Sequence, residues 1–437
     1  MRRYVVVGLG VAGIAAISAL RARDRSAEII LVGNETHGFY SRPGLAYYLT
    51  GEIPEKQLSI FSKDDWRSLN IQFLNAQATR LDPRPHHLVL GTDNIVTYDR
   101  LLLSTGSTAA PINVPGANLP QVVKLDDLED TRRILALTRR IKTAVVVGGG
   151  ILSLEMVEGL HSRGVSVHYL LRGGRYWPNI LDEVESHMVE HRLEQIGIHL
   201  HYHTEIAEIL GKHGNVTGVR TTADEVLSCG MVCVGIGIKP RMELAQAAGL
   251  AIEKGILVNE HLQSSDADIF AAGDVAQVVD PITGKSFIDT LWIPAREKGA
   301  TAAINMDGGN QAYKRSLVVN VLRLAGIMTT IIGAVGSGVD EDLVSIARGS
   351  SETWMQLPNT IAMESNLDVN HVRLMIGEQT LLGAIVMGDQ KLSIPLQDLI
   401  AAGTDITPIR NLLQPGAPLG QILMDFWTNV KGRVDKQ

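Results

Sequence analysis

The stretch that decides the fold lies at the beginning of the chain and reads Tyr4-Val5-Val6-Val7-Gly8-Leu9-Gly10-Val11-Ala12-Gly13. Its first four residues predict a short strand, and the Ala- and Leu-rich segment that follows to about Arg23 has helical spacing. Glu28–Val32 then predicts a second strand. Strand, glycine turn, helix and strand in this order form the first βαβ unit of a dinucleotide-binding fold.

Each glycine of this turn has its own physical task. Gly8 permits the tight turn, Gly10 lets the backbone reach a pyrophosphate, and Gly13 lets the helix pack closely on the strand. Val11 and Ala12 begin the helix, whose positive end attracts phosphates. Asn34 and Glu35, just beyond the second strand, can accept hydrogen bonds from ribose hydroxyls. The alternative is a glycine turn that is merely structural.

The same pattern returns about 140 residues later. Ala144–Val147 predicts a strand, Gly148-Gly149-Gly150 a turn, Ile151 and Leu152 the start of a helix that runs to about Ser162, and Val165–Leu171 a further strand. Ser153 stands where a third glycine is usual. The two units are too far apart for a solenoid repeat, so we expect two separate nucleotide-binding domains.

The end of the strand in the second unit offers no carboxylate to a ribose. Leu171 occupies that place, Arg172 follows it, and Arg175 lies close behind. Arginines favour a 2′-phosphate and no carboxylate repels one, so either NADH or NADPH can be the coenzyme and we expect NADPH to be accepted at least as well as NADH. The alternative is that both are solvated loop arginines.

Composition limits the class of protein. A chain of 437 residues suggests two or three domains, and the net charge of −7 argues against a general nucleic-acid binder. The longest apolar run, Ala325 to Val335, is well short of the ~20 residues that span a bilayer. Two cysteines, Cys229 and Cys233, and no secretory signal fit a cytoplasmic protein.

Three further strands end in glycine turns: Leu101–Gly106, Met231–Gly237 and Ile269–Asp274. Asp274 can accept a hydrogen bond from a ribityl hydroxyl, or it can cap a helix. From about Ser316 the chain has mixed strands and helices, and Leu381–Met387 predicts a buried strand.

These motifs occur in a recognisable order. Gly8-x-Gly10-x-x-Gly13, Ser104-Thr105-Gly106, Gly148-Gly149-Gly150 with Glu155, Val234-Gly235-Ile236-Gly237 with Pro240, and Ala271-Ala272-Gly273-Asp274 resemble the FAD-dependent pyridine nucleotide oxidoreductases of the glutathione reductase superfamily. Phe39–Leu49, which contains Tyr40-Ser41-Arg42-Pro43-Gly44-Leu45, is similar to the Tyr-x-Arg-Pro-x-Leu segment of NADH:rubredoxin reductases, ferredoxin reductases, apoptosis-inducing factor and nitrite reductase large subunits. The resemblance covers roughly residues 1–310.

The resemblance implies an α/β fold with two Rossmann-like dinucleotide-binding domains and an α+β C-terminal domain. Residues 1–110 and 242–315 would bind FAD, residues 111–241 would bind NAD(P)H, and residues 316–437 would make dimer or partner contacts. It places Arg42 on the FAD diphosphate, Glu155 near the nicotinamide, and Trp292 beside the flavin ring, unless Trp292 is simply a core residue. It also implies cofactor contacts from Ala78, Thr105, Gly106, Gly235, Ile236, Gly237, Gly273, Asp274 and Leu291.

The departures from the pattern exclude a disulfide reductase. Ser41–Leu45 holds no redox cysteine. On one strand, the spacing of Cys229 and Cys233 would put both on the same face about 13 Å apart, too far for a disulfide. Tyr47 replaces a lysine that many relatives place near the flavin, and Ala110 replaces a family arginine, so flavin contacts from these two positions are in doubt.

Seven histidines are candidate metal ligands: His161, His168, His187, His191, His199, His201 and His203. The last three would share one face of a strand, but no cysteine or carboxylate joins them at tight spacing. We expect a partly exposed alternating strand and no metal.

The expected activity is transfer of hydride from NAD(P)H to FAD and of electrons onward to a small carrier protein of the rubredoxin or ferredoxin type. The protein supplies orientation and electrostatics for the cofactor. One alternative is an NAD(P)H oxidase or quinone reductase with a small-molecule acceptor. Another, of a different class, is a slow-turnover flavin-binding signalling or scaffold protein. No nucleic acid and no membrane span are expected, and a homodimer is expected.

Overall fold

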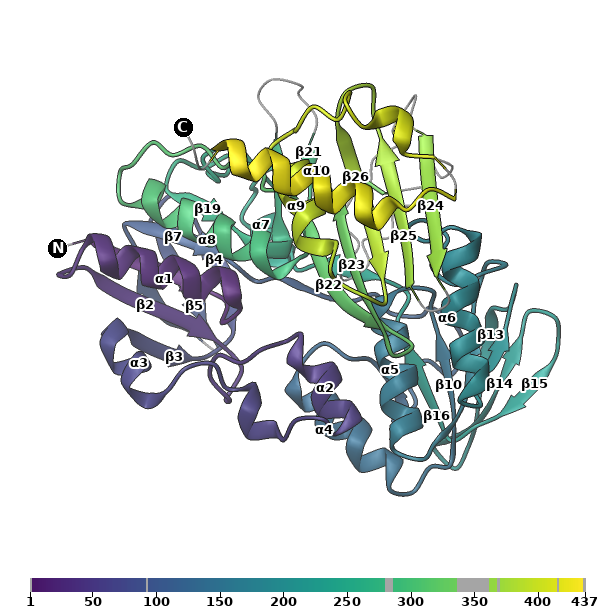
Figure 1. Ribbon diagram of the computed structural model, residues 1–437. Coiled ribbons are helices and arrows are strands. Elements are labelled where there is room, and N and C mark those ends of the chain that lie inside the picture. The colour runs from purple at the N-terminus through teal and green to yellow at the C-terminus, as the bar shows by residue number, and fades with distance from the viewer. Residues whose placement is uncertain are drawn as a thin grey trace.

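The computed structural model describes residues 2–91, 93–279, 286–335, 361–367, 370–414 and 416–434, the backbone alone for 361–367 and 433–434. Three units are visible in Figure 1: one mainly purple with a green part, one teal, and one yellow-green. Each unit is built on a five-stranded sheet.

The first unit has a fully parallel sheet in the order β19-β7-β1-β2-β3. Its strands are β1 (Arg3–Val7), β2 (Glu28–Gly33), β3 (Gln72–Asn75), β7 (Arg100–Leu103) and β19 (Ile269–Ala271). Helices α1 (Val11–Arg23) and α8 (Trp292–Met306) lie together beside it (Figure 1). Gly299 allows this contact, because a Cβ there would lie 2.1 Å from the carbonyl oxygen of Ala12. The predicted first βαβ unit is confirmed.

Shorter elements complete the first unit. They are the sheet β4 (Ala78–Asp82), β5 (His87–Leu90) and β6 (Asn94–Thr97), the sheet β18 (Ile256–Val258), β20 (Ala276–Val279) and β21 (Ser286–Phe287), and helices α3 (Lys63–Leu69), α7 (Glu243–Ala247) and η2 (Gly273–Val275). Helices α2 (Gly44–Thr50) and η1 (Glu55–Leu58) come from the same part of the sequence, but their buried side chains pack in the core of the second unit.

The second unit repeats the parallel plan in the order β12-β11-β10-β16-β9. Its parallel strands are β9 (Val122–Val123), β10 (Thr143–Val147), β11 (Ser166–Leu170), β12 (His199–His201) and β16 (Met231–Val234). It also contains α4 (Leu128–Thr138), α5 (Ile151–Ser162), α6 (Glu183–Gln195) and the antiparallel sheet β13 (Ile206–Lys212), β14 (Asn215–Thr221) and β15 (Val226–Ser228). The second predicted βαβ unit is therefore confirmed, and its helix ends at Ser162 as predicted.

A two-stranded antiparallel ribbon joins these units. β8 (Ser107–Ala109) pairs with β17 (Ile238–Pro240). The ribbon holds together the two places where the chain passes between the parallel sheets.

The third unit is an antiparallel sheet, β22-β23-β26-β25-β24, with helices on one face. Its elements are β22 (Val319–Leu324), β23 (Ile327–Gly333), β24 (Ile361–Leu367), β25 (Asn370–Ile376), β26 (Leu381–Met387), α9 (Ser393–Ala401), η3 (Arg410–Leu412) and α10 (Leu419–Val434). Ile332 and Val386 pack under α9 and α10, whereas Ile331 and Ile385 point into the core of the second unit. The α+β character and the buried strand Leu381–Met387 are confirmed.

The expectation that both cysteines share a strand face is wrong. β16 begins at Met231, so Cys229 precedes it, and Cys229 and Cys233 belong to the two different cores on either side of the sheet. Both are buried free thiols. Burial raises the pKa of the Cys229 thiol to about 11 and raises that of Cys233 as well, so neither is a ready thiolate.

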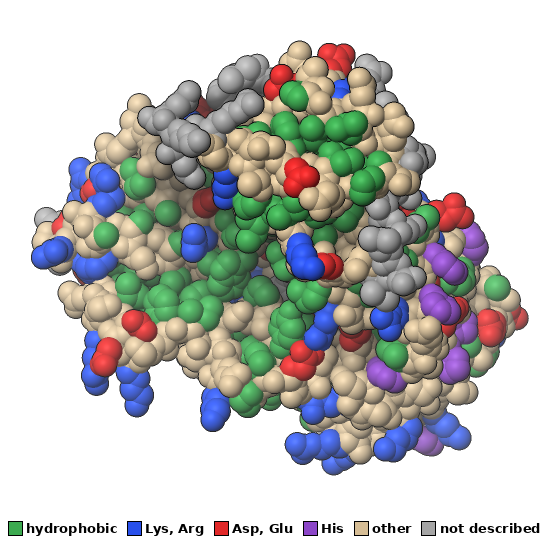
Figure 2. Space-filling view, in the orientation of Figure 1, with side chains coloured by type: hydrophobic (Ala, Val, Ile, Leu, Met, Phe, Trp, Pro, Cys, Tyr) green, Lys and Arg blue, Asp and Glu red, His purple; other side chains and the backbone are tan. Residues whose placement is uncertain are grey.

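The shared strand face predicted for three histidines is also wrong for one of them. β12 ends at His201, and His203 lies in a turn with a φ of 49°. The Nδ1 atom of His168 instead lies 3.0 Å from Nε2 of His201 on the neighbouring strand. Histidines gather on one side of the molecule in Figure 2.

Candidate functional site

A cavity of about 940 Å³ lies where the three units meet. Figure 2 shows hydrophobic side chains gathered toward the centre of this face of the molecule. The cavity brings together most of the residues that the sequence predicted for the first unit: Gly8, Gly10, Val11, Ala12, Asn34, Glu35, Arg42, Ala78, Thr105, Gly106, Gly273, Asp274, Leu291 and Trp292. From the second unit it adds Ile151, Leu152 and Glu155.

The first glycine turn has the geometry that a phosphate site needs. Gly8 has a φ of +117°, and a Cβ there would lie 2.1 Å from the carbonyl oxygen of Ser104. A Cβ at Gly13 would lie 2.2 Å from the carbonyl oxygen of Gly8, so only glycine lets α1 approach so closely. A Cβ at Gly10 would meet nothing within 4 Å. The first and third glycines are therefore required by the protein, and the second leaves open space beside the cavity.

Three helices that begin at this cavity lack capping side chains. α1, α5 and α8 have Gly10, Gly150 and Leu291 as N-caps, without a side-chain hydrogen bond and without an acidic residue in the first turn. α4 also begins at the cavity but is capped by Asp127, and α3 and α6 are capped by Ser62 and Asp182; all three carry acidic residues in their first turns. Uncapped N–H groups and the helix dipole are suited to binding anionic groups of a ligand.

The wall near Arg42 is fixed by a small polar network. Arg42 donates to the carbonyl oxygen of Asp126 at 2.9 Å and also pairs with the Glu35 carboxylate. The Tyr40 hydroxyl donates to Glu35 at 2.7 Å. Because these contacts orient Arg42 within the cavity wall, its guanidinium is positioned to meet an anion, whereas Glu35 is already engaged by two donors.

The opposite wall is formed by two strand ends. The Ser107 hydroxyl donates to the Asp274 carboxylate at 2.7 Å, and Gly273, with a φ of +81°, turns the chain beside Ala12. The alternative role of Asp274 as a helix cap is wrong, because Ala272 is the N-cap of η2 and makes no side-chain cap bond. Asp274 instead lines the cavity as a hydrogen-bond acceptor.

Trp292 starts α8 and lines the cavity. Its ring stacks on Phe39 with centroids 5.9 Å apart and planes at 22°, and it packs against the core of the first unit. Trp292 therefore packs against the core and also borders the cavity, and its place beside the flavin ring stays a prediction.

Several residues predicted for the second unit lie outside the cavity lining. They are Gly148, Gly150, Arg172, Arg175, Gly235, Ile236 and Gly237, together with Gly13 of the first unit. The Leu171 side chain is only 1% exposed and packs in the core. Arg172 is exposed, and Arg175 donates to the carbonyl oxygen of Pro178 at 3.1 Å.

One wall of the cavity was not predicted from the sequence. This wall is formed by Val319–Arg323 on β22 of the third unit, together with Glu158 of α5. Tyr47 of α2, whose contact with the flavin the sequence left in doubt, also lines the cavity. Further lining residues that were not predicted are Thr36, His37, Gln77, Ser104, Ser107, Asp127, Glu129, Arg241, Glu243, Thr290 and Ile293. Two of the unpredicted residues had a sequence signal: Ser104 is part of the Ser104-Thr105-Gly106 motif, and Glu158 lies three residues beyond Glu155 on one helix face.

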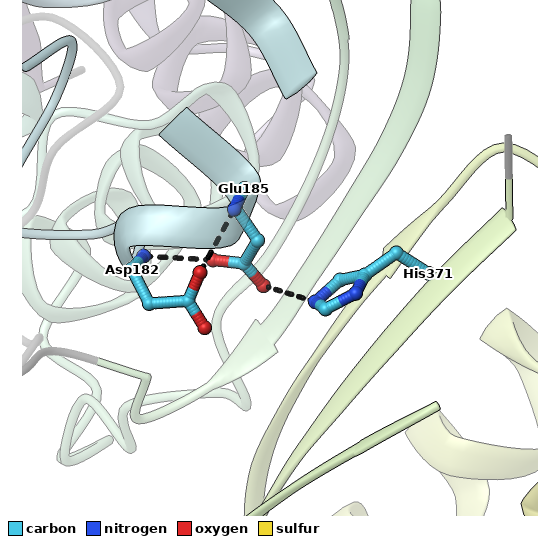
Figure 3. Close-up of side chains that lie close together, drawn as sticks. All are labelled: Asp182, Glu185 and His371. Atoms are coloured by element: carbon cyan, nitrogen blue, oxygen red, sulfur yellow. Dashed lines mark hydrogen bonds and ion pairs between the residues drawn. The ribbon is translucent and has the colours of Figure 1, made fainter. Parts of the chain in front are cut away.

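One cluster has the composition of a metal site. Asp182, Glu185 and His371 each offer a ligand atom within 4.8 Å of the others (Figure 3). However, Arg373 contacts the Glu185 carboxylate at 2.9 and 3.0 Å through two nitrogen atoms, and Asp182 and Glu185 form the capping box of α6. A guanidinium in this place repels a cation, so the cluster is an ionic anchor between the second and third units.

Comparison with known proteins identifies the class. Residues 2–304 match the model of the pyridine nucleotide-disulphide oxidoreductase family, and the chain belongs to this family.

Individual relatives sharpen the likeness. The chain is 25% identical to the nitrite reductase [NAD(P)H] of Bacillus subtilis over 95% of its own length and 49% of the relative. It is 31% identical to a probable ferredoxin reductase of Castellaniella defragrans over 70% of the chain and 76% of the relative. The fold matches the putidaredoxin reductase of a covalent putidaredoxin reductase–putidaredoxin complex with a TM-score of 0.83 and 24% identity over 97% of this chain and 98% of that one. The chain spans about half the length of the first of these relatives.

Proposed function

We propose that the protein is an FAD-dependent NAD(P)H oxidoreductase that passes electrons to a small electron-carrier protein. The observation that carries this proposal is the cavity at which α1 and α5, each following a glycine turn, begin without caps. Two such helix starts at one cavity suit two dinucleotides whose reactive rings must meet. Family membership supports the same conclusion.

The first unit would hold FAD, and its residues fit that group. Gly10, Val11 and Ala12 offer open backbone to the pyrophosphate, and Arg42 adds a charge-assisted donor. Asn34 and Glu35 would lie at the ribose, and Asp274 at the ribityl chain. When bound, FAD accepts a hydride and releases its electrons singly or in pairs. The proposed domains are an FAD-binding domain of residues 1–110 and 242–315, an NAD(P)H-binding domain of residues 111–241, and a C-terminal domain of residues 316–437.

The second unit would bind NADH or NADPH, with Glu155 beside the nicotinamide. The burial of Leu171 leaves no side chain at that position to contact the ribose or to repel a 2′-phosphate. Arg172 is exposed and free to reach such a phosphate, whereas Arg175 is partly held by Pro178. We therefore propose that NADPH is accepted at least as well as NADH.

The proposed acceptor is a small redox protein. The curated ferredoxin reductase relative and the putidaredoxin complex support this choice. Ile293 and Val321, which are 48% and 61% exposed, border the cavity and would bring the partner close to the cofactor. A quinone or oxygen reductase is the second candidate, because the cavity also has room for a small acceptor.

We also propose that the protein is cytoplasmic. The two buried free cysteines fit a reducing cytoplasm. None of the helices in the described part of the chain is both long enough and apolar enough to cross a bilayer.

A homodimer through the third unit is proposed from the resemblance, and light scattering of the purified protein tests it.

The central test is direct. Purified protein should be yellow, release FAD rather than FMN on denaturation, and be bleached by NADH or NADPH without oxygen. Turnover is then compared with ferredoxin, rubredoxin, quinone and oxygen as acceptors. Colourless protein that cannot be reconstituted with FAD contradicts the proposal, and near-zero turnover with every acceptor favours a scaffold role.

A further inference from the structure

Glu158 occupies a distinctive place at the junction of the three units. It lies one helical turn beyond Glu155 on α5, and both side chains line the cavity. α5 belongs to the second unit, Tyr47 lies on α2, which packs on α5, and Arg323 on β22 belongs to the third unit; all of them line the same cavity, as the glycine turn of the first unit does. Glu158 is partly exposed, as is Tyr47 beside Arg323, so Glu158 lies at the mouth of the cavity, where the lining meets solvent.

Its carboxylate is held without an ion pair of its own. Oε1 of Glu158 accepts a hydrogen bond from the backbone N–H of Gly326 at 3.2 Å. The nearby cation, Arg323, is engaged elsewhere: Nη1 donates to Oε2 of Glu52 at 2.9 Å, and the guanidinium lies 5.5 Å from the Tyr47 ring. Among the described residues, no salt bridge to Glu158 is formed within 4.0 Å.

These surroundings determine how the side chain titrates. Burial raises the pKa of Glu158 to about 7, and the Glu52 carboxylate adds to this, while Arg323 and the Gly326 N–H act in the opposite direction. The charged and titratable groups around it come from every packed element: Tyr47, Glu52, Glu155, Tyr169, Tyr176 and Arg323. A carboxyl group with this pKa exchanges its proton readily at neutral pH.

The proposed reaction leaves a proton to be moved. A hydride carries two electrons and one proton, and two one-electron carriers remove only the electrons. The balance is NAD(P)H + 2 oxidised carriers → NAD(P)⁺ + 2 reduced carriers + H⁺. With a quinone one proton is taken up instead of released: NAD(P)H + H⁺ + quinone → NAD(P)⁺ + quinol. In both cases one proton per turnover must cross between the cavity and solvent.

We propose that Glu158 is the proton-transfer residue of this cavity, which accepts the proton left there after electron transfer and passes it to solvent at the mouth. This inference rests on the proposed function. Glu158 works as an acceptor when it is ionised, so turnover with a one-electron carrier rises as the pH rises through about 7. The pH at which turnover rises depends on the charges around Glu158. Arg323→Gln removes a cation and should move the rise to higher pH, and Glu52→Gln removes an anion and should move it to lower pH.

The test separates proton transfer from hydride transfer. In FAD-loaded protein, Glu158→Gln should lower kcat with ferredoxin or ferricyanide by about a hundredfold and remove the pH step. The rate at which NAD(P)H bleaches the flavin without oxygen should stay within about twofold of wild type. Glu158→Asp should keep the pH step, and Glu194→Gln, an exposed glutamate on α6, is the matched control.

A second readout does not depend on activity. In protein labelled with ¹³C in its glutamate carboxyl groups, one resonance should titrate near pH 7 in wild type and be missing in Glu158→Gln. Unchanged kcat and pH profile in Glu158→Gln, or no such resonance, would overturn the proposal. Wild-type protein that holds no FAD or is not bleached by NAD(P)H would instead contradict the proposed function.

Discussion

The two glycine turns of the molecule share a backbone conformation but differ in which side of the helix–strand contact carries the glycine. Gly8 and Gly148 have φ values of +117° and +136°, and at each a Cβ would lie 2.1 Å from a carbonyl oxygen, of Ser104 in the first unit and of Gly235 in the second. Ser104 and Gly235 occupy equivalent places. Each directly follows a strand that pairs with the central strand of its sheet, β1 or β10. The backbone N–H of each donates at 2.8 Å to the carbonyl oxygen of the last residue of that central strand, Val7 or Val147. The two turns therefore have one backbone design.

The difference lies in which partner is the small residue. The first unit combines Gly13 on the helix with Ser104 after β7, and the second combines Ser153 on the helix with Gly235 after β16. A Cβ at Gly235 would lie 2.9 Å from Cβ of Ser153. Ser153 fits in a buried position because Gly235 leaves room for it, and its hydroxyl contacts the Gly150 carbonyl oxygen at 2.7 Å. The departure from the third-glycine pattern is thus compensated across the sheet.

The largest effect is expected at the glycines that the two turns share. Gly8→Ala and Gly148→Ala each place a Cβ against a backbone carbonyl at a positive φ, so each should cost more than about 4 kcal/mol of unfolding free energy or prevent folding. Gly149→Ala, whose Cβ would meet nothing within 4 Å, is the matched control and should cost about 1 kcal/mol or less. Urea unfolding measures all three.

Gly10→Val distinguishes packing from cofactor binding in the first turn. Because a Cβ at Gly10 meets no protein atom within 4 Å, the variant should fold with a melting temperature close to that of the wild-type apoprotein. It should nevertheless lose FAD, since the side chain fills the approach of the pyrophosphate. Stoichiometric FAD in this variant would count against the assigned turn.

The exchange of small residues gives a smaller and more specific effect. Gly235→Ser should cost about 1–3 kcal/mol through overpacking against Ser153, and adding Ser153→Gly should recover at least half of it, a coupling of about 0.5–3 kcal/mol. The same exchange in the first unit, Gly13→Ser with Ser104→Gly, should not recover, because a Cβ at Gly13 also meets the Gly8 carbonyl oxygen at 2.2 Å. Equal recovery in both units would mean that the turns are equivalent.

A modest effect is expected on coenzyme choice. Arg172→Ala should lower kcat/KM for NADPH about three- to tenfold, because one charge-assisted contact of an exposed arginine contributes about 1 kcal/mol. The value for NADH should change less than twofold, and Arg139→Ala on an exposed part of the second unit serves as the control. A strong NADH preference that the substitution leaves untouched would place the arginine in solvent.

The smallest effect is expected at the cysteines. Cys229→Ala and Cys233→Ala together should leave turnover and FAD content unchanged, because the thiols lie in two separate cores and line no part of the cavity. A large loss of electron transfer in folded, FAD-loaded protein would reveal a thiol relay.

The sequence by itself determined the local plan of the two nucleotide-binding units. A glycine at a positive φ, an apolar strand before it and a helical pattern after it are properties of neighbouring residues, so β1, α1 and β2, and β10, α5 and β11, could be read directly. The buried strand Leu381–Met387 was also evident, because its apolar run is continuous.

Only the tertiary structure decided which distant residues meet. The fit of Ser153 depends on Gly235, and the side of the sheet that Cys229 faces depends on where β16 begins. The cavity wall from Val319 to Arg323 exists because alternate residues of the third sheet pack into the core of the second unit, which brings Arg323 to Glu52 and Gly326 to Glu158. Local sequence carries no record of these contacts, because they join parts of the chain that only packing brings together.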